Sequence, residues 1–284
     1  MAGTGKAGSG MKRSGRRKRR RELGEYEHSG REYATGPWLP PGPNSGELFG
    51  VMDRPFKFKE HRLEFRDGRY RRWVGETLAT ELLIRKGTVG AFPVSPLHTP
   101  SILGKHIMAE FSSPVLVSPR SEMALYASLP VEVGVFVRDG EHYETVDVFS
   151  LTTQKYALYG SPNEGFICRW ASVTPSPDPP ASVRFPEEAV IRFIFRNTMN
   201  RWSKLDKAVF PGEMARIFYG NGAMSFPVVE IDIVNKGITR AKIDDRPYAK
   251  GMHPGPLSTM HTAPIRLKEL SIFKPESTLM VGGD

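Results

Sequence analysis

The stretch Met123–Val137, MALYASLPVEVGVFV, decides the fold that this sequence predicts. Its odd-numbered positions are all apolar, whereas polar residues such as Ser128 and Glu132 fall between them. Successive side chains of a β-strand point to opposite faces, so apolar residues at every second position are typical of a strand with one buried face. The pattern therefore predicts a pair of strands or one long bent strand.

A turn signal follows directly. The dipeptide Asp139-Gly140 tolerates positive φ angles and is typical of a tight β-hairpin. The residues after it, Tyr143–Leu151, again carry alternating apolar side chains. We therefore expect this segment to return as the second strand of a hairpin.

Short strand patterns fill the remainder of the sequence. Val229–Ile233 alternates apolar and acidic residues, and Asn221-Gly222 is a strong signal for a two-residue hairpin turn. The prolines Pro93, Pro96 and Pro100 predict a loop, because proline lacks the N–H that a sheet requires. Many short strands at close spacing predict an all-β, mostly antiparallel fold that resembles a β-sandwich, with two packed β halves.

Composition divides the chain into three parts. Residues 1–46 are rich in Gly, Pro and basic residues without an apolar periodicity, which predicts a disordered basic arm. Residues 47–173 form the expected first β domain, which contains the central hairpin. The segment 174–180 holds four prolines, which predicts a linker or a long crossover. Residues 181–284 form a second β domain or the second half of the same sandwich.

The positive charge of the chain is concentrated at its start. Residues 1–21 hold nine of the 40 basic residues and no acid, which leaves 31 basic residues against 31 acidic ones. Flexible cations bind phosphate backbones by releasing counterions, without reading sequence. We therefore expect the arm to contact RNA, the ribosome or DNA. The densest part of the charge is Lys12, Arg13, Arg16, Arg17, Lys18, Arg19, Arg20 and Arg21.

Several classes of protein do not fit the sequence. No apolar run approaches the roughly 20 residues that span a bilayer, and no apolar segment of a signal peptide follows the basic start. With one cysteine, Cys168, a disulfide within the chain is impossible, which favours a cytoplasmic location. The seven histidines lack the spacing of a helical zinc site. We therefore predict no metal, no cofactor, no catalytic residues and no enzymatic activity.

One set of polar residues near the central hairpin is a candidate small-ligand pocket. Its members are Asp147, Lys155, Tyr156, Tyr159, Cys168 and Arg169. Asp147 lies between two valines and is expected to face inward, where a buried carboxylate needs Lys155 or Arg169 as a partner. The alternative is a structural ion pair at a sheet edge. Cys168, flanked by apolar residues and without a nearby histidine, is expected to be a core residue.

Several segments of the chain, in order, resemble one known family. They are Leu129–Phe136, Val146–Leu151, Lys155–Gly160, Gly165–Trp170, Arg196–Thr198 and Phe218–Gly220. Together they look like the archaeal domain-of-unknown-function family numbered 432, over roughly Leu48 to Gly251. The resemblance implies an archaeal, cytosolic protein without an assigned reaction. Some relatives are joined to mechanosensitive-channel segments, which implies a regulatory module; this chain carries no such segment.

These observations favour a non-enzymatic binding or regulatory module whose basic arm contacts nucleic-acid phosphates. The alternative is a β-sandwich that acts through its charge-balanced body. In that case it binds a small ligand or carbohydrate, or serves as a soluble regulatory partner of a membrane channel. A protein partner is compatible with either hypothesis, and the sequence leaves the oligomeric state open.

Overall fold

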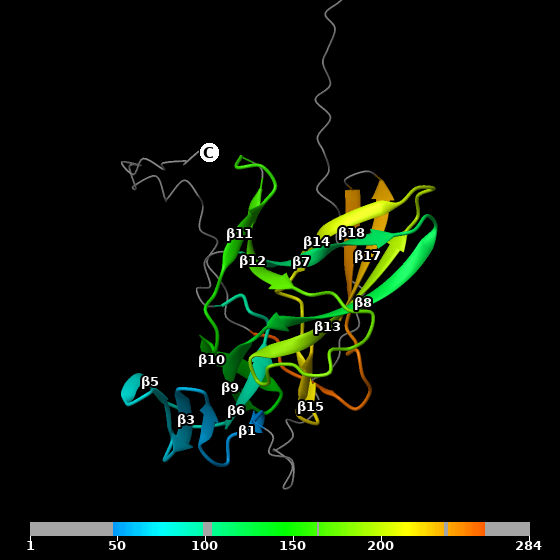
Figure 1. Cartoon of the computed structure of the whole chain (residues 1–284). Helices are drawn as coiled ribbons and strands as arrows, with labels where there is room; N and C mark the ends of the chain where they lie inside the picture. The colour runs from blue at the N-terminus through cyan, green and yellow to red at the C-terminus, as the bar shows by residue number, and fades with distance from the viewer. Residues whose placement is uncertain (1–47, 99–103, 164, 236–237, 259–284) are drawn as a thin grey trace, which may run out of the picture.

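The computed structural model describes residues 48–98, 104–163, 165–235 and 238–258 (Figure 1). These residues form nineteen strands in four sheets and contain no helix. Three of the strand pairings are parallel and the others are antiparallel. The all-β, mostly antiparallel prediction is confirmed. The basic arm of residues 1–46 lies outside the described residues.

The first sheet contains the predicted hairpin and is antiparallel throughout. Its strands, in order across the sheet, are β1 (Gly50–Val51), β6 (Thr88–Val94), β9 (Glu132–Asp139) and β10 (His142–Ser150). The turn between β9 and β10 has Gly140 at a φ of +65°, as the Asp139-Gly140 signal predicts. Strand β10 forms the free edge of this sheet.

The alternating stretch Met123–Val137 forms two strands that belong to different sheets. Strand β8 (Ser121–Pro130) pairs along its length with β13, whereas β9 pairs with β6 and β10. Pro130 ends β8, and the next residue, Val131, donates its backbone N–H to the carbonyl of Glu187 at 3.0 Å. One continuous apolar pattern therefore serves two sheets that share the core.

Two further sheets draw strands from both sides of the proline-rich segment. One has the order β11 (Tyr156–Tyr159), β12 (Phe166–Val173), β7 (His106–Val117) and β14 (Ser203–Pro211). The other contains β8, β13 (Glu188–Asn197), β15 (Phe218–Gly220), β16 (Ala223–Ser225), β17 (Val228–Asn235), β18 (Ile238–Asp244) and β19 (His253–Pro254). The predicted Asn221-Gly222 turn joins β15 to β16, with both residues at positive φ.

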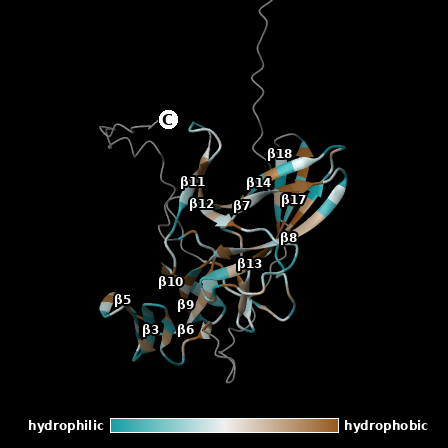
Figure 2. Cartoon of the chain, in the orientation of Figure 1, coloured by the Kyte–Doolittle hydropathy of each residue, from teal (hydrophilic) through white to brown (hydrophobic). Residues whose placement is uncertain are grey.

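The fourth sheet is a small antiparallel meander, drawn in blue and cyan in Figure 1. Its strands are β2 (Phe56–Phe58), β3 (His61–Arg66), β4 (Arg69–Val74) and β5 (Thr77–Leu83). Phe58, Leu63 and Tyr70 are fully buried and extend the main core into this sheet. Hydrophobic and hydrophilic residues both occur along these strands, as the mixed colours of Figure 2 show.

The prediction of a loop from Pro93 to Pro100 is wrong at Pro93. Pro93 lies within β6 and pairs in register with Val133 of β9. On its other side β6 pairs only at Gly90 and Ala91, with the two-residue strand β1. Pro93 therefore lies where β6 has a single partner, and proline is tolerated at such an edge position.

Candidate functional site

Asp147 does not join the other residues of the predicted pocket. It lies on β10, and its carboxylate accepts hydrogen bonds from the Tyr70 hydroxyl at 2.8 Å and from Arg72 Nε at 2.7 Å. Both donors are on β4 of the small sheet. The expectation that Lys155 or Arg169 pairs with Asp147 is therefore wrong. The alternative, a structural ion pair at a sheet edge, describes what the structure has.

These contacts are part of a seam between the small sheet and β10. We define the β4–β10 seam as His61, Tyr70, Arg72 and Asp147. The His61 ring stacks on Phe149 with 4.4 Å between ring centroids, and Arg72 Nη2 also donates to the Thr80 hydroxyl at 3.0 Å.

Electrostatics in the seam follow from burial. Tyr70 is fully buried, and its burial together with the neighbouring Asp147 carboxylate raises the pKa of the phenol well above its ordinary value. Burial, aided by the positive charge of Arg72, lowers the pKa of His61. The seam therefore holds a neutral tyrosine, a neutral histidine and one closed ion pair at neutral pH.

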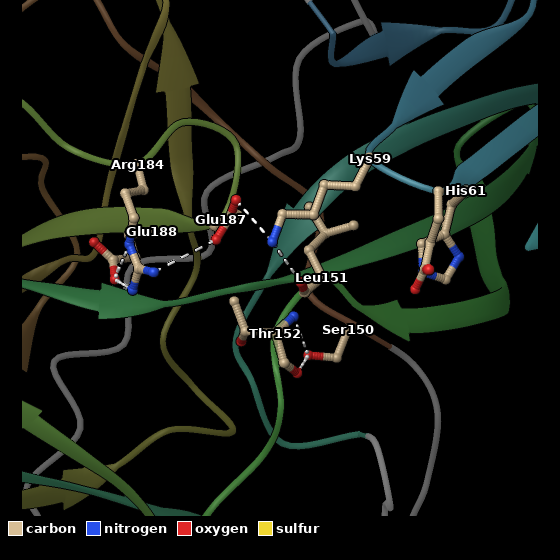
Figure 3. Close-up of polar contacts among 9 residues, drawn as sticks. Lys59, His61, Ser150, Leu151, Thr152, Arg184, Glu187 and Glu188 are labelled. Atoms are coloured by element: carbon tan, nitrogen blue, oxygen red, sulfur yellow. Dashed lines mark hydrogen bonds and ion pairs between the residues drawn. The ribbon is translucent and has the colours of Figure 1, made fainter. Parts of the chain in front are cut away.

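A second contact beside the seam fixes the turn between β2 and β3, and Figure 3 shows it. Lys59 donates to the backbone carbonyl of Leu151 at 3.1 Å and pairs with Glu187 at 2.9 Å. Arg184 in turn pairs with Glu187 and Glu188. This chain of charges links the small sheet to the start of β13, and every charged group in it has an opposite partner.

The remaining predicted residues lie on the β11–β12 ribbon, but on two different faces. Lys155 lies over the Trp170 ring at 5.4 Å, and Tyr159 packs against Phe166 at 5.5 Å. Cys168 shares this face and is fully buried. Burial raises the pKa of its thiol to about 12, so at neutral pH it is a protonated core residue, as predicted.

Tyr156 and Arg169 are the two predicted residues that the structure brings together. They face each other across β11 and β12. Beside them, the backbone N–H of Trp170 donates to the backbone carbonyl of Lys155 at 2.9 Å. Tyr156 and Arg169 therefore form a non-hydrogen-bonded pair of the antiparallel ladder. In such a pair the two facing side chains lie closer together than in a hydrogen-bonded pair. The guanidinium carbon of Arg169 lies 5.1 Å from the centre of the Tyr156 ring.

Glu132, which the sequence analysis did not select, acts electrostatically on both members of this pair and is itself in contact with further polar residues. We define the Arg169 cluster as Ser95, His98, Glu132, Gln154, Tyr156 and Arg169. Glu132 is fully buried, and its Oε2 accepts the His98 backbone N–H at 2.9 Å and lies 3.4 Å from His98 Nδ1. His98 Nδ1 also lies 3.2 Å from the Ser95 carbonyl. Two acceptors around one ring nitrogen indicate that Nδ1 carries the proton.

Charges within the cluster act on one another. Burial lowers the pKa of Arg169, while its hydrogen bond to Tyr156 and the negative charge of Glu132 oppose that shift. Burial raises the pKa of Tyr156, and the Arg169 charge opposes that shift. Glu132, Tyr156 and Arg169 are therefore close enough to interact electrostatically, although Glu132 lies in a different sheet from the other two.

The cluster differs from the seam in its hydrogen bonding. Five buried polar atoms of the cluster lack a hydrogen-bond partner: Ser95 Oγ, Gln154 Nε2 and Oε1, and Arg169 Nε and Nη1. Arg169 is only 2% exposed. Buried polar groups in proteins are almost always hydrogen-bonded, so each exception calls for an explanation such as a water or a ligand.

The burial of Glu132 could have been predicted from the sequence, although the alternation of apolar and polar residues argued against it. Polar residues such as Glu122 and Ser128 occupy even-numbered positions before β9, which suggests a solvent face for Glu132. Gly134 and Phe136 are also at even positions, and both are fully or largely buried with Glu132 in the strand. A strand buried on both faces reads as continuously apolar, so a single glutamate within it marks a buried charge.

Within the described ranges no group of three His, Cys, Asp or Glu side chains could hold a metal ion. The same residues contain no helix long and apolar enough to cross a membrane. The basic residues selected for nucleic-acid binding, from Lys12 to Arg21, lie outside the described part of the chain.

Comparison with known proteins adds one assignment. No curated protein and no solved structure matches the chain. Residues 49–273 match the family described as "Protein of unknown function (DUF432)", which covers most of the chain, including both the seam and the Arg169 cluster. The chain belongs to the DUF432 family.

Proposed function

We propose that this protein is a non-enzymatic binding module whose basic arm attaches it to nucleic-acid phosphates, in RNA, the ribosome or DNA. The observation that carries the proposal is the position of the charge. Residues 1–21 hold nine basic residues and no acid, and the rest of the chain is balanced. A cytoplasmic location belongs to the same proposal.

Ion pairs on the body support this assignment. Arg196 contacts Glu122 and Glu230 at 2.8 Å each, and Lys105 lies 3.0 Å from Glu213. Basic side chains engaged with carboxylates in this way contribute little net attraction to a phosphate backbone. The arm is therefore the main source of long-range attraction for a polyanion.

The test is the salt dependence of binding to a short single-stranded RNA and to a duplex DNA, followed by fluorescence anisotropy. Eight phosphate contacts predict a loss of affinity of about 10³-fold or more between about 50 and 200 mM salt. Sequence should matter little, because phosphate contacts do not read bases.

A matched variant replaces the eight basic residues from Lys12 to Arg21 by serine in the full-length chain. We expect this variant to lose most of its affinity for both nucleic acids and to unfold at the same temperature as the wild type. Binding that persists in the variant, or that does not respond to salt, would overturn the proposal.

A further inference from the structure

The Arg169 cluster contains more buried hydrogen-bonding capacity than its own residues use. Arg169 Nε and Nη1 are donors only, and they have no acceptor among the described residues. Arginine stays charged at any physiological pH, so burial alone cannot remove the cost of leaving these donors unpaired. Something outside the described side chains is needed to complete this site.

The other unpartnered groups belong to segments that adjoin the Tyr156–Arg169 pair in the chain or in a neighbouring sheet. Tyr156 faces Arg169 across the ribbon, and Gln154 lies two residues before Tyr156, just ahead of the start of β11. Ser95 follows β6, where Val94 pairs with Glu132. The β11–β12 ribbon and the segment after β6 therefore both carry buried donors without a partner in the described part of the chain.

The ribbon also has a side that lies near the surface. Strand β11 is the edge of its sheet, and Gln154 and Tyr156 are only partly buried, whereas Lys155 between them is exposed. The side of the ribbon that is nearest to solvent is therefore the β11 edge, beside the Tyr156–Arg169 pair.

The chemistry of these groups selects an anion with a single charge. Arg169, the Gln154 amide and the Ser95 hydroxyl together offer several hydrogen-bond donors to an oxygen anion. The buried carboxylate of Glu132 is close enough to affect Arg169, so a second strong negative charge would be repelled. A monocarboxylate meets both conditions better than a phosphate dianion.

We propose that the Arg169 cluster binds the carboxylate group of a small, singly charged organic acid. The ligand's oxygens accept hydrogen bonds from Arg169 and from Gln154 or Ser95, while Glu132, held by His98, limits the charge that the site accepts. This binding site lies in the body and is separate from the basic arm.

The test uses acetate as the probe on the full-length protein. Thermal unfolding is followed in about 100 mM sodium acetate and in sodium chloride and sodium phosphate of equal ionic strength. If this acetate concentration is about ten times the Kd, the melting temperature should be about 3 °C higher in acetate than in chloride. Phosphate should give a smaller rise than acetate.

Three variants locate the effect. Arg169→Lys keeps a positive charge but loses the planar set of donors, and it should abolish the acetate shift. Arg192→Lys is the matched control, because Arg192 also has an unpartnered Nε and lies over a tyrosine ring, Tyr126, at 5.7 Å. The control should keep the full shift. Tyr156→Phe, a milder change, should reduce the shift if Arg169→Lys does not fold.

Three results would overturn the proposal. Equal melting temperatures of the wild type in acetate and in chloride would mean that water alone fills the cluster. A shift that is as large in Arg169→Lys as in Arg192→Lys would place acetate elsewhere. A larger rise with phosphate than with acetate would contradict the charge argument.

Discussion

The β4–β10 seam and the Arg169 cluster have four kinds of polar side chain in common. Each contains an arginine, a tyrosine, a carboxylate and a histidine, and each joins strands of two different sheets. In the seam, the Asp147 carboxylate takes hydrogen bonds from both Arg72 and Tyr70. In the cluster, two guanidinium nitrogens of Arg169 remain without a partner.

The difference shows how a structural polar group is distinguished from one available for binding. An arginine that is closed by a carboxylate has satisfied its donors and serves to hold two sheets together. A buried arginine with open donors destabilises the free protein, and a ligand that supplies acceptors recovers that cost. The seam has one open atom of its own, His61 Nδ1, which a neutral imidazole can leave without a proton.

The largest expected effect is the loss of the seam carboxylate. Asp147→Ala leaves the partly buried Arg72 without its partner, so we expect a loss of about 3 kcal/mol in the free energy of unfolding, measured by urea denaturation. The control is Asp139→Ala in the same hairpin, which removes an exposed pair with Lys86 and should cost less than about 0.5 kcal/mol. Equal losses in the two variants would show that the seam does not carry the stability assigned to it.

The next effect compares the two arginines directly. Arg72→Met leaves the Asp147 carboxylate buried and unpaired, whereas Arg169→Met removes donors that were already open. We expect Arg72→Met to cost about 2 kcal/mol more than Arg169→Met in a buffer free of carboxylates, by chemical denaturation. An equal cost would mean that Arg169 is as well satisfied as Arg72 and would remove the distinction between the two regions.

Substitutions of the two tyrosines should also cost more stability in the seam than in the Arg169 cluster, but the difference should be smaller than for the arginines. Tyr70→Phe removes a hydrogen bond to a buried carboxylate and should cost about 1.5 kcal/mol. Tyr156→Phe keeps the ring that faces Arg169 and should cost less than half of that. Urea denaturation of the two variants measures both values, and a larger loss for Tyr156→Phe would contradict the comparison.

The smallest effect is a pH dependence that comes from His61. Its pKa is lowered by burial, so in acid the unfolded chain binds a proton that the folded chain resists, and stability falls as the pH drops below the ordinary value of about 6.5. Replacing His61 by phenylalanine removes this loss. We expect the stability of the wild type relative to His61→Phe to decrease from about pH 7.5 to about pH 5.5.

The contribution of His106, whose pKa is also lowered by burial, is common to both proteins and cancels in this difference. Urea denaturation at several pH values gives the measurement. A stability difference that is independent of pH would mean that His61 titrates alike in the folded and unfolded states.

Local chemistry made parts of the fold predictable. Gly140 in the first hairpin and Asn221-Gly222 in the second adopt positive φ angles, while Asp139 ends β9 opposite His142, and both hairpins form where the sequence predicts them. Pro93 was misread because its place within β6 depends on β9, about forty residues later in the chain. The proline alone does not reveal that β6 has only β9 as a pairing partner at position 93.

The site was harder to predict for the same reason. Asp147 was expected to pair with a nearby cation, but its partner Arg72 is 75 residues away. Of the predicted pocket, the cross-strand pair Tyr156 and Arg169 came together, since two strands of one ribbon place them opposite each other. Glu132 comes from a different sheet, and only the three-dimensional packing brings it close.

The central claim is that the open donors of Arg169 form a carboxylate site, while the closed ion pair of Arg72 is structural. Equilibrium dialysis of the full-length protein against radiolabelled acetate, at constant ionic strength, tests this claim most directly. The account predicts one bound acetate per chain in the wild type and in Arg192→Lys, and none in Arg169→Lys. No acetate retained by the wild type, or equal retention by Arg169→Lys, would contradict it.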